Sequence, residues 1–466
     1  MLVAETWANY GIDLHLDPGP LVRAGLEAAL REAIRTGRLN PGTRLPASRA
    51  LAVDLGIARN TVAEVYGQLV AEGWLAARTG SGTWVAEHPA PVKQSPGAAL
   101  AEATQPRYDL RPGVPDLAMF PHRAWLAAAR KALSTAPKHV LGYPDPRGLP
   151  QLRMVLADYL ARVRGVTASP SRIVICSGYA HGLALLCQVL RARGSRVIAI
   201  EAYGHHAHRR IAAAHGLHPA PLSVDADGVV PDDLGEADAV LLTPAHQFPL
   251  GVTLHPQRRR AIAHWAVRTA GLIIEDDYDG EFRYDRKPIG AMQALAPDHI
   301  IYGGTASKSL APGLRLGWLV LPGHLIDEVV AAKESAGGHG GSLEQLTLAE
   351  FITSGGYDRQ VRHARLAYRR RRDRLAAALH RHAPHVRVTG IAAGLHALVE
   401  LPANHREEEV IARAAARGLA LEGLASYSAT GNGHNPALVV GYGRPPDHTF
   451  TTALARLCAV LAENSP

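Results

Sequence analysis

A lysine at position 308 lies in the segment "HIIYGGTASKSLAPGLRLGWLV", residues 299–320, directly after an apolar run. Such a lysine could bind a nucleotide phosphate or bond covalently to a cofactor. A phosphate-binding P-loop reads G-x-x-x-x-G-K-[ST] and continues at once into a helix. Here Ser307 precedes the lysine, and the following "APG" run interrupts any helix. The pattern therefore argues against an ATP or GTP site.

The residues around Lys308 match the chemical needs of pyridoxal 5'-phosphate (PLP). This cofactor needs a lysine amine for its aldehyde, a carboxylate for its ring nitrogen and a hydrogen-bond donor for its phenolic oxygen. The run "IIEDDYD" ends a predicted buried strand at Asp276, and Tyr278 lies two residues on. Residues at this spacing can face one ligand edge. We expect Lys308 to form the internal aldimine, Asp276 to hold the pyridinium proton and Tyr278 to bond the phenolic oxygen.

The expected phosphate ligands flank the same turn. Hydroxyl groups and one arginine suit a phosphate, and so do the first backbone amides of a helix. The segment "SGYAHGL" begins such a predicted helix. Each feature alone is common, since an acidic strand end is usually a cap and an arginine is usually a surface charge. As an ordered set they predict a PLP site, with these phosphate ligands: Thr305, Ser307, Arg315, Gly178 and Tyr179.

The sequence pattern of the larger part of the chain predicts an α/β domain. Near-continuous apolar runs alternate with helix-like stretches, which is typical of strands buried on both faces of a mainly parallel sheet. Ligands in such sheets bind at the carboxyl ends of the strands. The predicted strands are 172–178, 195–201, 239–244, 271–276 and 299–304.

The chain of 466 residues is long enough for two or three domains. An Ala- and Pro-rich stretch without periodicity, 89–106, has the composition of a linker. It separates a head, 19–88, from a body, 107–466. The net charge of +8 is a mild indication of an anionic partner.

Composition also bears on the compartment and on metals. We find no leader and no apolar stretch long enough to cross a membrane, so we expect a cytoplasmic protein without membrane contact. The three cysteines are widely spaced, which excludes a disulfide framework and a Cys-type zinc site. "GHHAH", 204–208, is the one dense histidine cluster. Since no carboxylate or cysteine ligands lie near it, we expect no metal.

The head has the element order of a winged helix-turn-helix. Amphipathic helices are predicted at 20–39, 48–56 and 58–73, and a β-hairpin with a glycine tip at 74–87. In this motif the second helix of the turn reads base edges in the major groove. A small helical domain that binds protein or only dimerises is the alternative. The expected DNA contacts are Arg59, Asn60 and Thr61 to bases, and Arg44, Ser48 and Arg49 to phosphates. The glycine wing with Gly80 is expected against the backbone or the minor groove.

At this point the chain resembles known families. "PGTRLPASRALAVDLGIARNTVAEVYGQLVAEGWL" resembles the GntR-type DNA-binding head. Segments such as "GYPDPRGLPQLR", "TPAHQFPLGVTL" and "SKSLAPGLRLG" resemble a fold-type I aminotransferase. Together they resemble the MocR/GabR-like transcriptional regulators over nearly the whole chain. The resemblance implies a head-to-tail homodimer in which Tyr143 of one subunit reaches the phosphate of the other. It also implies Gln247 near the phenolic oxygen and an aromatic ring stacked on the pyridine.

Two positions depart from the family pattern. The family commonly reads E-D-P-G-Y where this chain has "EAYGH", so the stacking residue becomes His205, which we prefer to Tyr203. Aminotransferases also carry an arginine that grips the substrate carboxylate, in a motif like L-R-L-G-F. Here Val439 occupies that place. Arg209 and Arg444 are the possible substitutes.

The leading hypothesis is a PLP-dependent transcriptional regulator that binds an operator in double-stranded DNA. It would sense an amine, an amino acid or PLP itself through Lys308, with little or no turnover. The alternative is a true aminotransferase with an accessory DNA-binding head. A third class, a DNA-binding protein whose body has lost its cofactor, also stays open. The arginine-rich predicted helix 358–379 is interpreted as a solvated helix face, with an auxiliary DNA contact as the minor alternative.

Overall fold

The computed structural model describes residues 22–78, 81–87, 106–284, 289–338, 340–431 and 435–463. The chain divides into two compact units, Met1–Thr104 and Gln105–Pro466. The predicted linker lies outside the described residues except for Pro106, so its limits stay a prediction. Within the described ranges, no helix is both long enough and apolar enough to cross a membrane.

The first unit packs three helices against a small sheet. Apolar side chains spaced along the helices, such as Leu26, Leu30, Val65 and Leu69, are fully buried in one core. Gly56 ends the second helix with a left-handed φ of 65°, a conformation that favours glycine and that turns the chain into the third helix. The elements are α1 (Val22–Arg35), α2 (Ser48–Leu55), α3 (Arg59–Ala71), β2 (Leu75–Arg78) and β3 (Gly82–Val85). This is the predicted winged helix-turn-helix order.

A short strand in the wing was not predicted. β1 (Arg44–Leu45) pairs antiparallel with β3, which makes a three-stranded sheet in the order β1-β3-β2. Two residues are too few to give a periodic signal in the sequence. The strand fixes the backbone of Arg44 beside the wing.

The second unit is built around a seven-stranded sheet in the order β5-β13-β12-β11-β10-β6-β7. Only β13 runs antiparallel to its neighbours, so the prediction of a mainly parallel sheet in an α/β fold is confirmed. Each predicted strand is present within two residues of its expected ends. The strands are β5 (Ile173–Cys176), β6 (Val197–Glu201), β7 (His218–Leu222), β10 (Ala239–Leu242), β11 (Leu272–Asp276), β12 (Ile300–Thr305) and β13 (Gly317–Val320).

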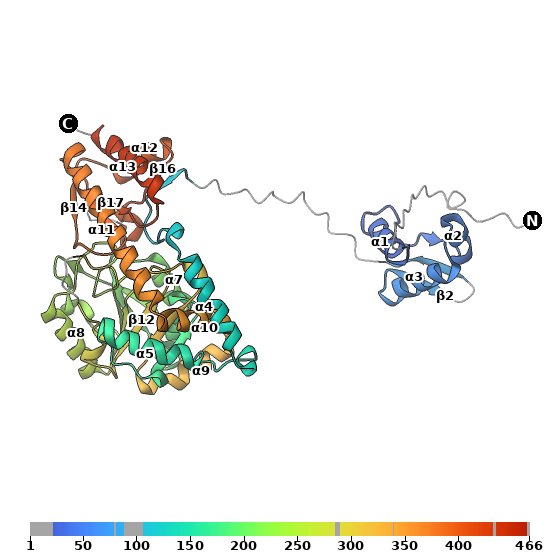
Figure 1. Cartoon of the computed structure of the whole chain (residues 1–466), viewed down its shortest axis with the longest axis horizontal. Helices are drawn as coiled ribbons and strands as arrows, with labels where there is room; N and C mark the ends of the chain where they lie inside the picture. Colours follow the sequence, from blue (N-terminus) through green and yellow to red (C-terminus); the bar gives the residue numbers. More distant parts are fainter. Residues whose placement is uncertain are drawn as a thin grey trace, which may run out of the picture. The chain divides into compact units, whose positions relative to one another are not determined.

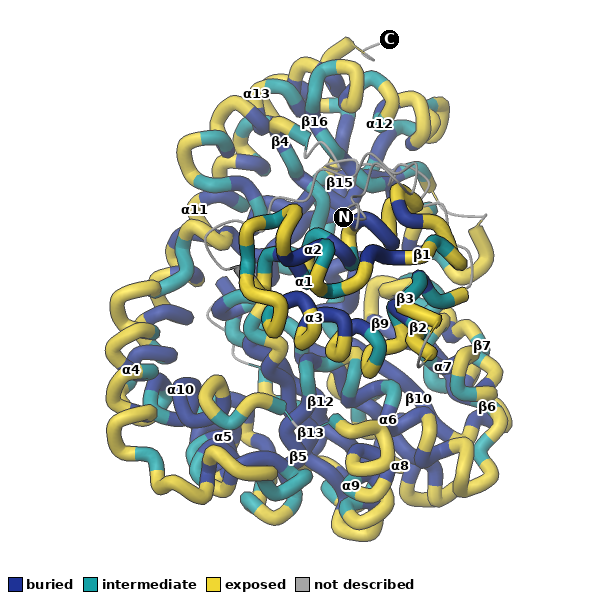
Figure 2. Tube along the Cα trace, turned by 90° about the vertical axis from the view of Figure 1, so that its right-hand side faces the viewer, coloured by how far each residue is buried: buried dark blue, intermediate teal, exposed yellow. Residues whose placement is uncertain are grey.

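Helices cover both faces of this sheet. Neighbouring strand residues such as Val174 and Ile175 belong to different buried clusters, one on each face. Figure 2 shows the tube at β5, β12 and β13 coloured mainly as buried. One face packs against α6 (Tyr179–Ala192), α7 (His206–Ala214) and α9 (Ile326–Ser335), and the other against α4 (His122–Thr135), α5 (Pro150–Arg164), α8 (Pro256–Thr269) and α10 (Ser342–Thr353).

A long helix joins this sheet region to a smaller group of elements at the carboxyl end of the chain. The helix is α11 (Gly356–His382), which crosses from one group to the other in Figure 1. β14 (Arg387–Thr389), β15 (His396–Glu400) and β17 (Ala437–Gly441) form an antiparallel sheet there. β16 (Leu419–Ala420) pairs with β4 (Tyr108–Asp109) near the start of the body. α12 (Glu407–Ala416) and α13 (Asp447–Ala462) complete the group.

Candidate cofactor site and DNA-binding surface

A cavity of about 310 Å³ lies where the carboxyl ends of β10, β11 and β12 meet the first turn of α6. This is the place at which open α/β sheets bind ligands. Nine of the predicted cofactor residues line it: Gly178, Tyr179, His205, Asp276, Tyr278, Thr305, Ser307, Lys308 and Arg315.

Lys308 follows the end of β12 in a tight turn, and its Nζ donates a hydrogen bond to the carbonyl of Gly113. Burial lowers the pKa of this amine, although the nearby carboxylate of Asp276 opposes the shift. A lowered pKa raises the fraction of neutral amine, the form that attacks a carbonyl carbon. The turn therefore presents a reactive lysine to the cavity.

Asp276 ends β11 at the cavity and is only 4% exposed. Its Oδ1 has no hydrogen-bond partner among the described residues, and burial raises the pKa of the carboxyl group well above its ordinary value. A buried carboxylate needs a cation or donor to remain ionised. A protonated ring nitrogen would supply both.

His208 lies beside Asp276 and was missed in the sequence. Its Nε2 is 4.0 Å from Oδ2 of Asp276, and burial lowers the pKa of the imidazole to about 3. The side chain is therefore neutral at physiological pH. The spacing of three residues from His205 on α7 was the signal that could have placed both rings in the cavity.

One corner of the cavity is formed by hydroxyl groups, one guanidinium group and a helix N-terminus. The hydroxyls of Thr305 and Ser307 lie 2.8 Å apart. Arg315 adopts a left-handed φ of 53°, and its Nη2 donates to the carbonyl of Ser177 at 2.6 Å. A side chain at Gly317 would lie 2.8 Å from the backbone of Gly178, so this glycine lets β13 approach the start of α6. Such a corner has the donors that a phosphate requires.

Three predicted positions lie outside the cavity. The amide of Gln247 donates to the carbonyls of Tyr203 and Phe248, and the aromatic ring of Phe248 lines the cavity instead. The expected place of Gln247 near the phenolic oxygen stays a prediction. Tyr203 also does not line the cavity, whereas His205 does. Tyr143 is 97% exposed and does not line this cavity.

The cavity lacks an arginine where an aminotransferase would hold a substrate carboxylate. Val439 is fully buried in an apolar cluster with Phe248 and Tyr427. Arg209 donates to the carbonyls of Glu201, Gly204 and Tyr427, and Arg444 is ion-paired with Asp109. Among the described lining residues, Arg315 is the single arginine. Neither suggested substitute faces the cavity.

The residues present fit PLP. A buried lysine, an unpartnered buried carboxylate oxygen and a corner with hydroxyl and guanidinium donors match the three chemical groups of this cofactor. Over the described ranges, no three histidine, cysteine or carboxylate side chains are grouped as around a metal ion.

The head presents a set of polar side chains at the start of α3 and around the turn before it. Arg44, Arg49, Arg59 and Asn60 are exposed, and Ser48 and Thr61 are half-buried. Gly80 lies outside the described residues. The first turn of α3 is therefore open to a partner, as the recognition helix of a helix-turn-helix must be.

Each of the two units matches the model of a known protein family. Residues 23–85 match the model of the gntR family of bacterial regulatory proteins, and residues 110–425 match aminotransferase class I and II. The HTH-type pyridoxine biosynthesis transcriptional regulator PdxR of Corynebacterium glutamicum is 33% identical, over 93% of this chain and 94% of its own. The probable rhizopine catabolism regulatory protein MocR of Rhizobium meliloti is 33% identical, over 76% of each chain. The chain belongs to the MocR-type transcriptional regulators of the GntR family.

The body of this MocR-type regulator also resembles solved aminotransferases. An archaeal alanine:glyoxylate aminotransferase superposes with a TM-score of 0.71 at 26% identity, covering 77% of this chain and 91% of that one. A kynurenine aminotransferase from Pyrococcus horikoshii, solved with PMP, gives 0.70 at 24% identity, over 78% and 92%. The second likeness shows the fold alone. The regulator therefore combines a DNA-binding head with an aminotransferase fold, and the reading as an enzyme with an accessory head is not favoured.

Proposed function

We propose that this regulator binds PLP at Lys308 and adjusts its affinity for operator DNA to a small ligand that reaches the same cavity. When bound, PLP supplies an aldehyde that condenses reversibly with primary amines. Lys308 would hold the aldehyde carbon, Asp276 the ring nitrogen and Tyr278 the phenolic oxygen. Thr305, Ser307, Arg315 and the first amides of α6 would hold the phosphate.

One observation carries this proposal. The cavity has the residues that suit PLP, but among the described residues it lacks the arginine with which an aminotransferase holds the substrate carboxylate. An arginine pair with a carboxylate orients an amino acid for bond cleavage. With Val439 buried in an apolar cluster, that orientation is missing. We therefore expect binding and exchange of an amine without efficient turnover.

The effector class follows from the same cavity. A primary amine could displace Lys308 from the cofactor, and PLP itself could act by filling the site. The relative in Corynebacterium glutamicum is by name a regulator of pyridoxine biosynthesis, which makes PLP itself a specific candidate. An amine or amino acid is the second candidate.

A homodimer is part of the proposal. Leu126 and Leu133 lie two turns apart on one face of α4 and are 51% and 54% exposed, and Leu141 follows close by. An apolar face of this kind is suited to a second copy of the chain. The exposed Tyr143 would then reach the partner's phosphate. Charged substitutions at Leu126 and Leu133 should convert the dimer to a monomer in sedimentation experiments.

The regulatory step needs two conformations with different affinities for DNA. A ligand shifts the balance only by its own preference for one of them. Since the operator lies in the cytoplasm, we propose that compartment for the protein.

The test is operator affinity of the full chain in three states: without cofactor, with PLP, and with PLP plus a primary amine. DNA from upstream of its own gene serves as the first candidate operator, at one stated salt concentration. We expect affinity to differ between at least two states. Equal affinity in all three, together with amino-donor turnover at ordinary enzyme rates, would reverse the proposal.

A further inference from the structure

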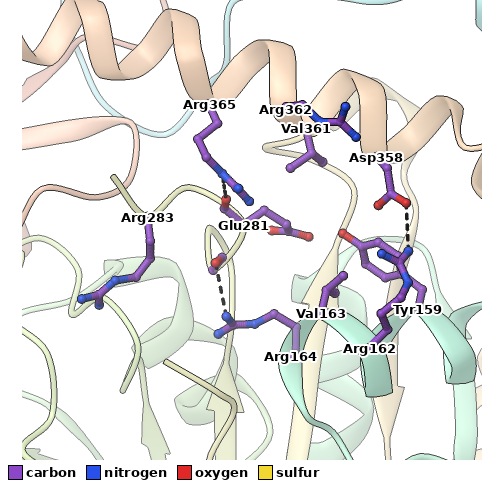
Figure 3. A pocket seen from close by; sticks show the side chains of 11 residues that line it. Tyr159, Arg162, Val163, Arg164, Glu281, Arg283, Asp358, Val361, Arg362 and Arg365 are labelled. Atoms are coloured by element: carbon purple, nitrogen blue, oxygen red, sulfur yellow. Dashed lines mark hydrogen bonds and ion pairs between the residues drawn. The ribbon is translucent and has the colours of Figure 1, made fainter. Parts of the chain in front are cut away.

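A second cavity, of about 470 Å³, lies apart from the cofactor site between the end of α5, the loop after β11 and the start of α11. Figure 3 shows its lining side chains. Five arginines and two carboxylic acids contribute to the wall: Arg162, Arg164, Arg283, Arg362, Arg365, Glu281 and Asp358. Its volume is in the range of small-molecule sites.

Two of these arginines carry charge that the protein does not neutralise. Arg162 is ion-paired with Asp358, and Arg164 is paired with Asp277. Arg362 has no ion-pair or hydrogen-bond partner among the described residues. Arg365 uses only its Nε, which donates to the carbonyl of Glu281. The two lie three residues apart on one side of α11, so that both can reach one anion.

A buried polar group faces the same space. Tyr159 is 3% exposed, and within the described part of the chain its hydroxyl has no hydrogen-bond partner. Figure 3 shows this hydroxyl and the Glu281 carboxyl group pointing toward each other in the middle of the cavity. Burial raises the pKa of Glu281 to about 7, so the carboxyl group can donate as well as accept a hydrogen bond near neutral pH. A hydroxyl that faces a cavity without a protein partner can bond a ligand.

The cavity wall is bonded to the immediate neighbours of both main cofactor residues. Arg164 holds Asp277, which follows Asp276, through two contacts of 2.6 and 3.0 Å. Tyr357 lies 2.6 Å from the hydroxyl of Ser309, which follows Lys308, and 3.4 Å from Glu281. A ligand that moves this wall therefore acts on the backbone that carries the cofactor residues.

We propose that this cavity is a second ligand site for a small oxyanion with an uncharged polar end, a phosphate ester or a hydroxycarboxylate. Arg362 and Arg365 bind the anion, and Tyr159 and Glu281 bind the polar end. Occupancy changes the affinity of the body for PLP, which gives the regulator a second chemical input.

The binding test uses calorimetry on the full chain in buffer without phosphate. Glycerol 3-phosphate and glycerate are the two probes, and inorganic phosphate reports the anion contact alone. We expect at least one organic probe to bind, with affinity reduced about tenfold or more in Arg362→Ala/Arg365→Ala. Tyr159→Phe should lower the affinity for the probe roughly two- to tenfold, because it removes one hydrogen bond. The control is Arg370→Ala, which removes an exposed arginine of α11 outside the cavity.

Three results would overturn the site. They are no binding of any probe, wild-type probe affinity in the double variant, or a loss of probe affinity in Arg370→Ala as large as in the double variant. A double variant that binds operator DNA weakly while no probe binds would instead assign these arginines to DNA. The regulatory part is tested by the PLP dissociation constant with and without the bound probe. We expect a change of about fivefold or more, and an unchanged constant would overturn it. Probe binding needs no cofactor and no operator, so its failure is distinguishable from failure of the proposed function.

Discussion

His246 Nδ1 lies 2.8 Å from Oδ2 of Asp279, and both side chains are buried beside the cofactor cavity. The hydroxyl of Tyr278 lies 3.1 Å from the same nitrogen, so the pair fixes the residue expected to hold the phenolic oxygen. Because the pair is buried, removing one partner leaves the other unsatisfied. Asp279→Ala and His246→Ala should each lower the free energy of unfolding of the body. The double variant should lower it by less than the sum of the two single losses. The double-mutant cycle from urea unfolding should give about 0.5–3 kcal/mol of coupling. Additive losses would mean that the pair does not act as a unit.

Sequence selection should depend on the first turn of α3. Arg59 is exposed there, without a partner among the described residues. If it reads a base edge, Arg59→Ala should lose roughly 1–3 kcal/mol of operator affinity and relax sequence choice. Arg35, ion-paired with Glu32 on α1, provides the matched control. Fluorescence anisotropy with the operator and one mismatched site measures both effects. Wild-type selectivity in Arg59→Ala would exclude it as a base reader.

The half-buried imidazole of His208 should make the cofactor-free protein sensitive to acid. Burial lowers the pKa of His208 to about 3, from an ordinary value of 6.5. The folded state therefore binds fewer protons than the unfolded state between these values, so stability is lost as pH falls below 6.5. For His208 alone this amounts to at most about 3 kcal/mol between pH 6.5 and 4. His208→Asn should flatten the curve of unfolding free energy against pH, whereas His380→Asn, at an exposed site, should not. Identical slopes would contradict the assignment.

The position of Val439 should not accept the missing arginine. Val439 is buried in an apolar cluster with Phe248, Leu398 and Tyr427, where a guanidinium group would lose its hydration. Val439→Arg should therefore destabilise the body by roughly 3 kcal/mol or more, without gain in turnover of α-amino acids. Val439→Ala is the control, because it removes packing without introducing a charge. The difference in unfolding free energy between the two variants reports the cost of the buried charge. Restored transamination in a stable Val439→Arg protein would show that this position still faces the substrate.

Much of the site could be predicted because it depends on local patterns. Asp276 and Lys308 each follow a buried apolar strand, and parallel strands bring their carboxyl ends to one edge. Phe248, rather than its neighbour Gln247, lines the cavity, and the sequence could not show this because no period in a loop indicates which residue faces inward. His396 lines the cavity from β15, far along the chain. Only the packing of the carboxyl-terminal group on the sheet brings it there.

The most direct measurement locates the lysine that carries PLP. The full chain is incubated with PLP, reduced with borohydride and digested, and the modified peptide is found by mass spectrometry. Lys333 is an internal comparison, because it is also buried but donates to the carbonyls of Pro146 and Ile175, away from the cavity. We expect the phosphopyridoxyl group on Lys308, and loss of visible absorption in Lys308→Ala. Label on Lys333, or an unchanged spectrum in Lys308→Ala, would contradict the account.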